Sequence, residues 1–144
     1  MIAFALAAAL AFTWLGMTIA ISFIEAPLKF RAPGISIRLG LGIGRVVFRA
    51  VNRVEIALCA LIVIAATLGI RQSGVLILIG LAVLILLIQL IVVRPRLNRR
   101  SDLILAGEDA PERSSGHAGY IALEVLKVIV LTGLGVACLI NLGG

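Results

Sequence analysis

Residues His117–Lys127, HAGYIALEVLK, lead directly into the apolar run VIVLTGLGVACLINL. Their polar and aromatic side chains recur at helical spacing, and at about 100° per residue they fall on one helix face. They are His117, Tyr120, Glu124 and Lys127. A carboxylate and an ammonium are thereby drawn into a segment whose composition suits lipid. The stretch predicts a transmembrane helix with a polar face.

The composition of the whole chain is that of a membrane protein. The 144 residues are 62% hydrophobic and 14% charged, whereas an ordinary soluble domain is about 25% charged and 45–50% apolar. A soluble fold of this size could not cover so much apolar surface. The formal net charge of +6 could suggest nucleic acid as a partner. The basic residues lie at segment ends, where a membrane explains them, so we expect membrane lipids and no nucleic acid.

Four apolar segments approach the roughly 20 residues that a transmembrane helix needs. We expect spans at about residues 2–24, 46–70, 74–94 and 117–142. The fold class is therefore an all-α membrane protein with one domain, a four-transmembrane-helix bundle. No basic residue precedes Lys29, so we expect a retained first helix rather than a cleaved signal peptide. The glycine-rich stretch 40–44 is expected to be a flexible connector or a site of close helix packing.

Positive charges gather in two of the loops between these spans. The loop after the first span carries Lys29, Arg31 and Arg38, with Arg45 at its edge, and the loop after the third carries Arg94, Arg96, Arg99, Arg100 and Arg113. The positive-inside rule places both long loops in the cytoplasm and both termini outside. We expect a multi-pass protein of a bacterial inner (plasma) membrane.

The second and fourth spans share a pattern. The residues Arg45, Phe48, Asn52 and Glu55 are spaced like His117, Tyr120, Glu124 and Lys127, 72 positions later. A proline also follows the first and the third span, at positions 27 and 95. The pattern suggests two tandem helical hairpins. The alternative is that the membrane interface favours basic and aromatic residues at any cytoplasmic helix start.

Glu55 and Lys127 should lie at the same depth in the membrane. Each precedes fifteen apolar residues, and the two helices run in the same direction. An unpaired charge in hydrocarbon costs several kcal/mol. We therefore predict an ion pair between Glu55 and Lys127, with Asn52 and Glu124 beside it. Glu25, at the end of the first span, is expected to face Arg45 or Arg49.

These residues define a candidate intramembrane polar cluster: Asn52, Glu55, His117, Tyr120, Glu124 and Lys127. Polar side chains of this kind either hold membrane helices together or form a binding site or proton pathway. Arg45, Arg49 and Arg53 would suit an anionic headgroup at the rim of the cluster. Snorkelling to the interface explains the same arginines without a ligand.

No reaction chemistry stands out in the sequence. One histidine, two methionines and two cysteines form no haem, copper or other metal ligand set, so we expect no cofactor and no metal site. Cys59 and Cys138 lie in apolar runs and should be buried small hydrophobes. The Gly40–Arg45 stretch lacks the strand and the Lys-Ser/Thr ending of a phosphate loop. We expect a protein that is not an enzyme.

The stretch WLGMTIAISFIEAPLKFRAP, followed by FRAVNRVE, resembles small bacterial four-helix membrane proteins of unknown function. Their first helix ends in Ala-Pro, and their second helix carries Asn and Glu. The group is distantly similar to transmembrane-protein-205-like sequences. The resemblance covers about the first half of the chain, and it implies four spans and no established activity.

The sequence leaves three functions open. The polar cluster could bind or carry a lipid-like or anionic small molecule, which requires a cavity beside Glu124 and Lys127. The chain could be an accessory subunit of a larger membrane complex, which predicts a dry cluster. It could also be a lipid-modifying enzyme, in which His117 would open onto a headgroup pocket. A homo-oligomer is a further possibility, because four helices enclose little volume.

Overall fold

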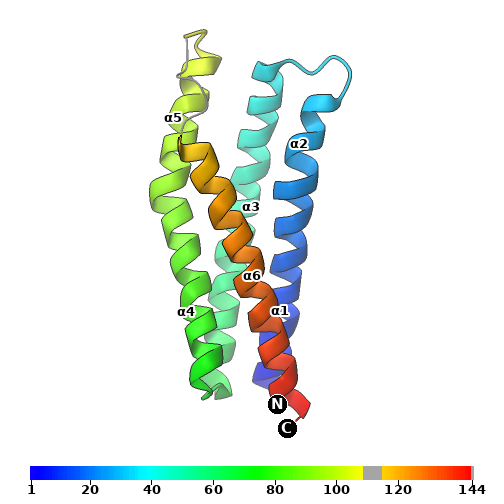
Figure 1. Cartoon of the computed structure of the whole chain (residues 1–144), viewed down its shortest axis with the longest axis vertical. Coiled ribbons are helices and arrows are strands. Elements are labelled where there is room, and N and C mark those ends of the chain that lie inside the picture. The colour runs from blue at the N-terminus through cyan, green and yellow to red at the C-terminus, as the bar shows by residue number, and fades with distance from the viewer. Residues whose placement is uncertain (109–114, 144) are drawn as a thin grey trace.

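The computed structural model describes residues 1–108 and 115–143, and within these residues the secondary structure is helical, without strands (Figure 1). The α-helices are α1 (Ile2–Thr18), α2 (Ala26–Leu28), α3 (Ile37–Gly69), α4 (Ser73–Ile88), α5 (Arg94–Leu105) and α6 (Ser115–Gly143). The intervening segments Ile19–Glu25 and Gln89–Val93 are π-helical, and Lys29–Arg31 is a 3-10 turn. Arg113, one of the predicted loop arginines, lies outside the described residues.

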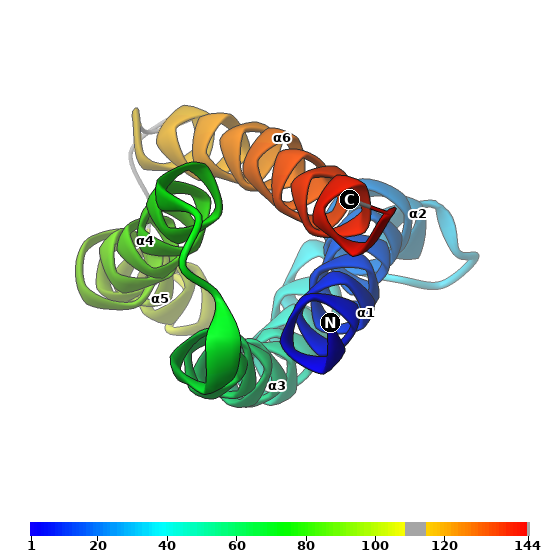
Figure 2. The same ribbon diagram turned by 90° about the horizontal axis from the view of Figure 1, so that it is seen from below.

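Four continuous helical stretches are long and apolar enough to cross a membrane: Ile2–Arg31, Ile37–Gly69, Ser73–Leu105 and His117–Gly143. The predicted fold class, an all-α four-helix membrane bundle, is confirmed. In the end-on view, α1 and α4 face each other across the bundle, and so do α3 and α6 (Figure 2). Both termini lie at one end together with the α3–α4 turn (Figure 1). The outer surface exposes isoleucine, leucine and valine side chains, as a lipid-facing surface should.

The expectation of a flexible connector at residues 40–44 is wrong, because α3 begins at Ile37 and contains this stretch. The Ser36 side chain caps the helix by accepting a hydrogen bond from the Leu39 N–H at 3.1 Å. Gly40 packs directly against the Phe30 ring, where a Cβ atom would collide with the ring. Gly40 therefore serves close packing inside a helix, whereas Gly42 faces open space. With 33 residues, α3 is about 50 Å long and projects beyond a hydrocarbon core of about 30 Å.

The two prolines do not end their helices. Pro27 and Pro95 each stand at the start of a further helical segment, and a π-helical turn precedes each one. Proline has no N–H to donate to the carbonyl four residues earlier, so the backbone before it is free to take the wider turn. Both hairpins thus have the same irregularity in their first helix.

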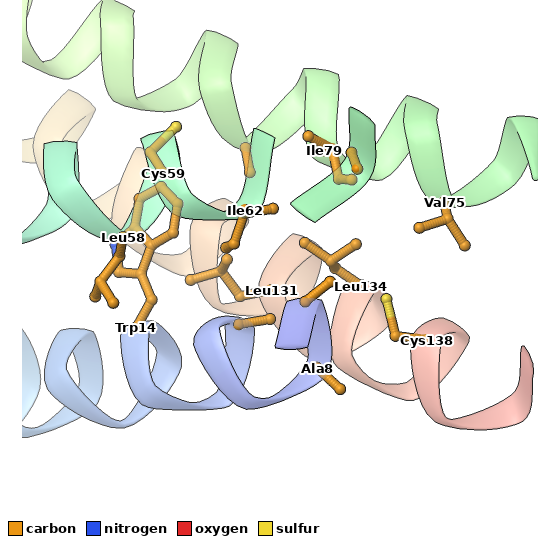
Figure 3. Close-up of a cluster of buried hydrophobic side chains, with 14 of the residues drawn as sticks. Ala8, Trp14, Leu58, Cys59, Ile62, Val75, Ile79, Leu131, Leu134 and Cys138 are labelled. Carbon is orange, nitrogen blue, oxygen red and sulfur yellow. The ribbon is translucent and has the colours of Figure 1, made fainter. Parts of the chain in front are cut away.

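Buried apolar side chains from α1, α3, α4 and α6 pack together in one core (Figure 3), which occupies the half of the bundle near the termini. Alanines on α1 let α6 approach closely, as small residues do between membrane helices. Leu131 and Leu134 of α6 are fully buried, and Ile62 of α3 and Val75 of α4 are nearly so. Cys59 and Cys138 are buried free thiols, as predicted. The buried polar residues lie outside this apolar half, in the middle of the bundle and toward the end with the long loops.

Candidate functional site

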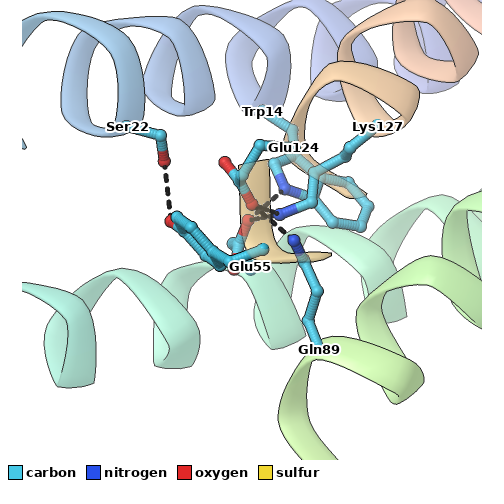
Figure 4. Close-up of polar contacts among 7 residues, drawn as sticks. Trp14, Ser22, Glu55, Gln89, Glu124 and Lys127 are labelled. Atoms are coloured by element: carbon cyan, nitrogen blue, oxygen red, sulfur yellow. Dashed lines mark hydrogen bonds and ion pairs between the residues drawn. The ribbon is translucent and has the colours of Figure 1, made fainter. Parts of the chain in front are cut away.

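The predicted ion pair between α3 and α6 is present. Lys127 Nζ lies 2.6 Å from Glu55 Oε1 (Figure 4), and their side chains are only 1% and 4% exposed. Since α3 and α6 are opposite helices of the bundle, the pair crosses its centre. The sequence predicted this pair because an apolar run of the same length follows Glu55 and Lys127, which places the two charges at the same depth.

Three further side chains complete the arrangement. Lys127 also donates to Glu124 Oε1 at 2.8 Å, one turn away on α6. Gln89 Nε2, from the π-helical turn after α4, donates to the same oxygen at 2.5 Å. The indole N–H of Trp14 on α1 donates to Glu55 Oε1 at 3.0 Å. We call these five residues (Trp14, Glu55, Gln89, Glu124 and Lys127) the central cluster.

The central cluster draws on all four spans and is shielded from solvent. Counted as whole residues, backbone included, its members are between 0% and 3% exposed. The ammonium, the indole and the amide each donate to a carboxylate of the cluster, so the cost of burying them is offset by charge-assisted hydrogen bonds. The arrangement is chemically suited to fixing the rotation and depth of four helices.

Two members of the central cluster, Trp14 and Gln89, are missing from the polar cluster that was predicted from the sequence. A signal existed for both. Gln89 is the one polar residue between Gly74 and Val93, and a buried tryptophan usually finds an acceptor for its N–H. Sequence does not show which way a helix turns such a residue, so neither partner could be assigned.

Tyr120 lies beside the central cluster, one turn before Glu124 on the same helix face. Its hydroxyl is 3.1 Å from Ser22 Oγ in the first π-helical turn (Figure 4). Its ring meets Phe48 edge to face, with 6.0 Å between centroids and 84° between planes. Tyr120 and Phe48 are 72 positions apart, as are Lys127 and Glu55, so two pairs that correspond in the proposed repeat are also in contact.

The other two predicted members stand apart from the central cluster. His117 is exposed in the first turn of α6, at the loop end of the bundle. Asn52 is half-buried, and its side chain makes no hydrogen bond within the described part of the chain. The helix face predicted for α6 is therefore correct for Tyr120, Glu124 and Lys127 only.

The expected rim is arranged differently from the prediction. Glu25 contacts Lys29, one turn further along the chain, at 3.6 Å, and not Arg45 or Arg49. Arg45 instead forms an ion pair with Asp102 and donates to the Asn98 carbonyl at 3.3 Å. The reason is that α5 continues beyond Pro95 and carries Asp102 alongside α3.

Arg49 and Arg53 are exposed on α3. No ion pair or hydrogen bond joins their side chains to another described residue. Of the three predicted rim arginines, only Arg45 therefore has a side-chain partner among the described residues, Asp102.

A different basic group lies at the loop end of the cluster. Arg94 stacks on two aromatic rings, with its guanidinium carbon 4.3 Å from the Phe48 centroid and 5.4 Å from that of Tyr120. Lys29 Nζ is 5.4 Å from the Phe48 centroid. Cations within about 6 Å of a ring centroid are attracted by its face. Phe48 therefore holds two cations next to the central cluster.

Comparison with family models, with curated proteins and with solved structures gives no match for this chain. The resemblance to small four-helix membrane proteins therefore stays a prediction.

Proposed function

We propose that this chain is a small non-enzymatic membrane protein that serves as an accessory subunit of a larger membrane complex. In this role the central cluster holds the bundle together and binds no ligand. The observation that supports the proposal is the closure of the cluster: Lys127, Gln89 and Trp14 all donate to Glu55 or Glu124, and none of the five residues is more than 3% exposed. A rigid bundle of this kind would act through its outer surface.

The alternative functions have less support at this site. A carrier of a lipid-like or anionic molecule would need a cavity beside Glu124 and Lys127. An open hollow of about 450 Å³ lies elsewhere, on the outer face of α3, and is lined by Arg38, Leu39, Gly42, Ile43, Val46 and Val47, whereas Glu124 and Lys127 are 3% and 1% exposed. A lipid-modifying enzyme based on His117 would need a headgroup pocket at that residue, and His117 is instead exposed at the loop end.

Native mass spectrometry in mild detergent tests the role of the central cluster. Wild type would be compared with Lys127→Met and Glu124→Gln, and with Asp102→Asn as a control for an exposed carboxylate. We expect wild type and the two cluster variants to show no difference in retained small molecules. We also expect both cluster variants to be less stable than wild type. A molecule retained by wild type and by Asp102→Asn, but lost from both cluster variants, would contradict the proposal.

The accessory role has its own measurement. In membranes solubilised with a mild detergent, the native protein should run in an assembly well above the 15.1 kDa of one chain. Its mass would show whether the partner is another protein or further copies of this chain. Migration as a monomer under conditions that keep other membrane complexes intact would contradict an accessory role.

The proposal also includes an orientation, with both termini outside and both long loops in the cytoplasm of a bacterial inner membrane. It is supported by the arginine-rich loops, and by the position of both termini and the α3–α4 turn at one end of the bundle. Single cysteines at the exposed positions Ser73 and Asn98 would lie on opposite sides, while the native thiols are buried. A membrane-impermeant maleimide should label Ser73→Cys and not Asn98→Cys in intact cells. The reverse pattern would invert the orientation.

A further inference from the structure

Arg94 has hydrogen-bond donors without acceptors. Its guanidinium stacks on Phe48 and Tyr120, but no hydrogen bond or ion pair joins it to another residue in the described ranges. The side chain is half-buried. A guanidinium presents five N–H donors in a planar fork. The faces of the two rings attract its positive charge, but they do not replace the oxygen acceptors that its N–H groups need. The exposed edge of Arg94 is therefore open to an external oxygen acceptor.

The π-helical turn explains why Arg94 points inward at all. In a regular α-helix, residues five apart lie about 140° apart around the axis, so Gln89 and Arg94 could not both face the bundle centre. In the wider turn, the backbone N–H of Arg94 donates to the Gln89 carbonyl. Residues five apart then come close to the same face of the helix. Gln89 then reaches Glu124, and Arg94 reaches the rings above it.

The depth of Arg94 matches the headgroup layer. From Ser73 to Val93 the chain is helical and apolar except at Gln89 and Ser73. At 1.5 Å per residue this length is about 30 Å, the thickness of a hydrocarbon core. Arg94, the next residue, thus stands where lipid phosphates begin.

A second cation lies against the same Phe48 ring. Lys29 Nζ lies 5.4 Å from the Phe48 centroid and contacts Glu25 at 3.6 Å. A Cβ atom on Gly44 would come within 2.9 Å of Lys29 Nζ. The lack of a side chain at Gly44 therefore leaves room for the Lys29 amine. Arg94, Lys29 and Glu25 together carry one net positive charge. The adjacent central cluster, with two carboxylates and one ammonium, carries one net negative charge, so what Arg94 and Lys29 offer a phosphate is their N–H donors.

We propose that Arg94 and Lys29, held around Phe48, bind the phosphate of a singly charged phosphate ester, the chemistry of an anionic phospholipid headgroup. Arginine offers its N–H fork to two phosphate oxygens, and lysine adds a point charge. The two rings hold the guanidinium in place before the ligand arrives, which lowers the entropy lost on binding. The site goes beyond the accessory role and does not depend on it.

The test measures phospholipid binding to the purified full chain by native mass spectrometry titration in mild detergent. The probes are phosphatidylglycerol, phosphatidylcholine and, as a soluble source of the same group, glycerol phosphate. The variants are Arg94→Gln and Lys29→Gln. Arg96→Gln is the matched control, because Arg96 lies on the same helix, is exposed, and loses the same charge on substitution.

We expect wild type to bind phosphatidylglycerol at least tenfold more tightly than phosphatidylcholine. Arg94→Gln should weaken the binding of phosphatidylglycerol about tenfold and Lys29→Gln about threefold, while Arg96→Gln changes it less than twofold. If glycerol phosphate binds alone and displaces phosphatidylglycerol, the site is a phosphate site that also takes a soluble ligand. If it does neither, the site stands as a lipid headgroup site.

Two results would overturn the site. Equal losses in Arg94→Gln and Arg96→Gln would mean that the basic loop attracts anionic lipid without a specific contact. Unchanged binding in Arg94→Gln, with a lower melting temperature, would mean that Arg94 only balances the charge of the central cluster. Should Arg94→Gln fail to fold, Lys29→Gln against Arg96→Gln decides in the same way. Neither result bears on whether the central cluster is closed to ligands, which the Lys127 and Glu124 variants measure.

Discussion

Lys127 and Glu55 meet across the centre of the bundle, 2.6 Å apart and on opposite helices. Lys127 is the only ammonium in the central cluster, and it serves two carboxylates, Glu55 and Glu124. Removing it would leave both acids buried without a counter-charge. The stability of the bundle should therefore depend more on this residue than on any other single charge in the cluster.

The substitution Lys127→Met should lower the free energy of unfolding by about 3–5 kcal/mol, the usual cost of breaking a buried ion pair. The measurement is reversible unfolding in mixed micelles. Asp102→Asn, which removes an exposed partner of Arg45, should cost less than about 1 kcal/mol and serves as the control. Equal losses in the two variants would contradict a central role for Lys127.

Adding Glu55→Gln to Lys127→Met should restore part of the lost stability. Replacing both members of a buried pair by uncharged groups is often close to neutral, but here Glu124 still lacks its counter-charge, so the recovery should be partial. The double variant is measured in the same unfolding experiment. If it is less stable than Lys127→Met alone, the hydrogen bond that Glu55 accepts from Trp14 outweighs the cost of burying the unpaired Glu55 carboxylate.

Trp14→Phe tests the donor from α1. It removes the hydrogen bond from the indole to Glu55 and should cost about 1.5–3 kcal/mol, the range for a hydrogen bond to a charged group, in addition to lost packing. The packing loss is separated by a double-mutant cycle with Glu55→Met, which has no side-chain oxygen to accept the indole N–H. A coupling energy near zero would show that Trp14 contributes by packing alone.

The hydrogen bond between Tyr120 and Ser22 should contribute little. Hydrogen bonds between membrane helices average about 0.6 kcal/mol, and Tyr120→Phe keeps the ring contacts with Phe48 and Arg94. Tyr120→Phe, Ser22→Ala and the double variant should therefore each lose about 0.6 kcal/mol in the unfolding assay. Additive losses would mean that the two hydroxyls do not bond to each other.

The sequence predicts the ion pair because the depth of a charge can be counted along the chain. Each charge precedes the same length of apolar residues, so Glu55 and Lys127 had to meet if their helices faced one another. Rotation about a helix axis cannot be counted in this way. The third span is apolar on every side, so nothing in its pattern shows that Gln89 turns toward Glu124.

The prediction that Glu25 would face Arg45 or Arg49 is wrong because of helix length. It took Pro95 as the end of the third span, which left Arg45 without a partner on α5. The structure continues the helix to Leu105, so Asp102 reaches Arg45. Neither the π-helical turn nor the inward position of Arg94 follows from proline alone, because proline removes one hydrogen bond without choosing the direction in which the backbone widens.

The glycines at the start of α3 give a final prediction, which tests the difference between a helix and a connector. Gly42 lies in the helix with open space where a Cβ would be, whereas Gly40 packs against the Phe30 ring. In a helix, Gly42→Ala should raise the free energy of unfolding by about 0.5–1 kcal/mol, because alanine loses less backbone entropy. Gly40→Ala should gain less, or lose stability, because the ring must move. In a flexible connector neither substitution would have a helical benefit, and the two would behave alike in the unfolding assay.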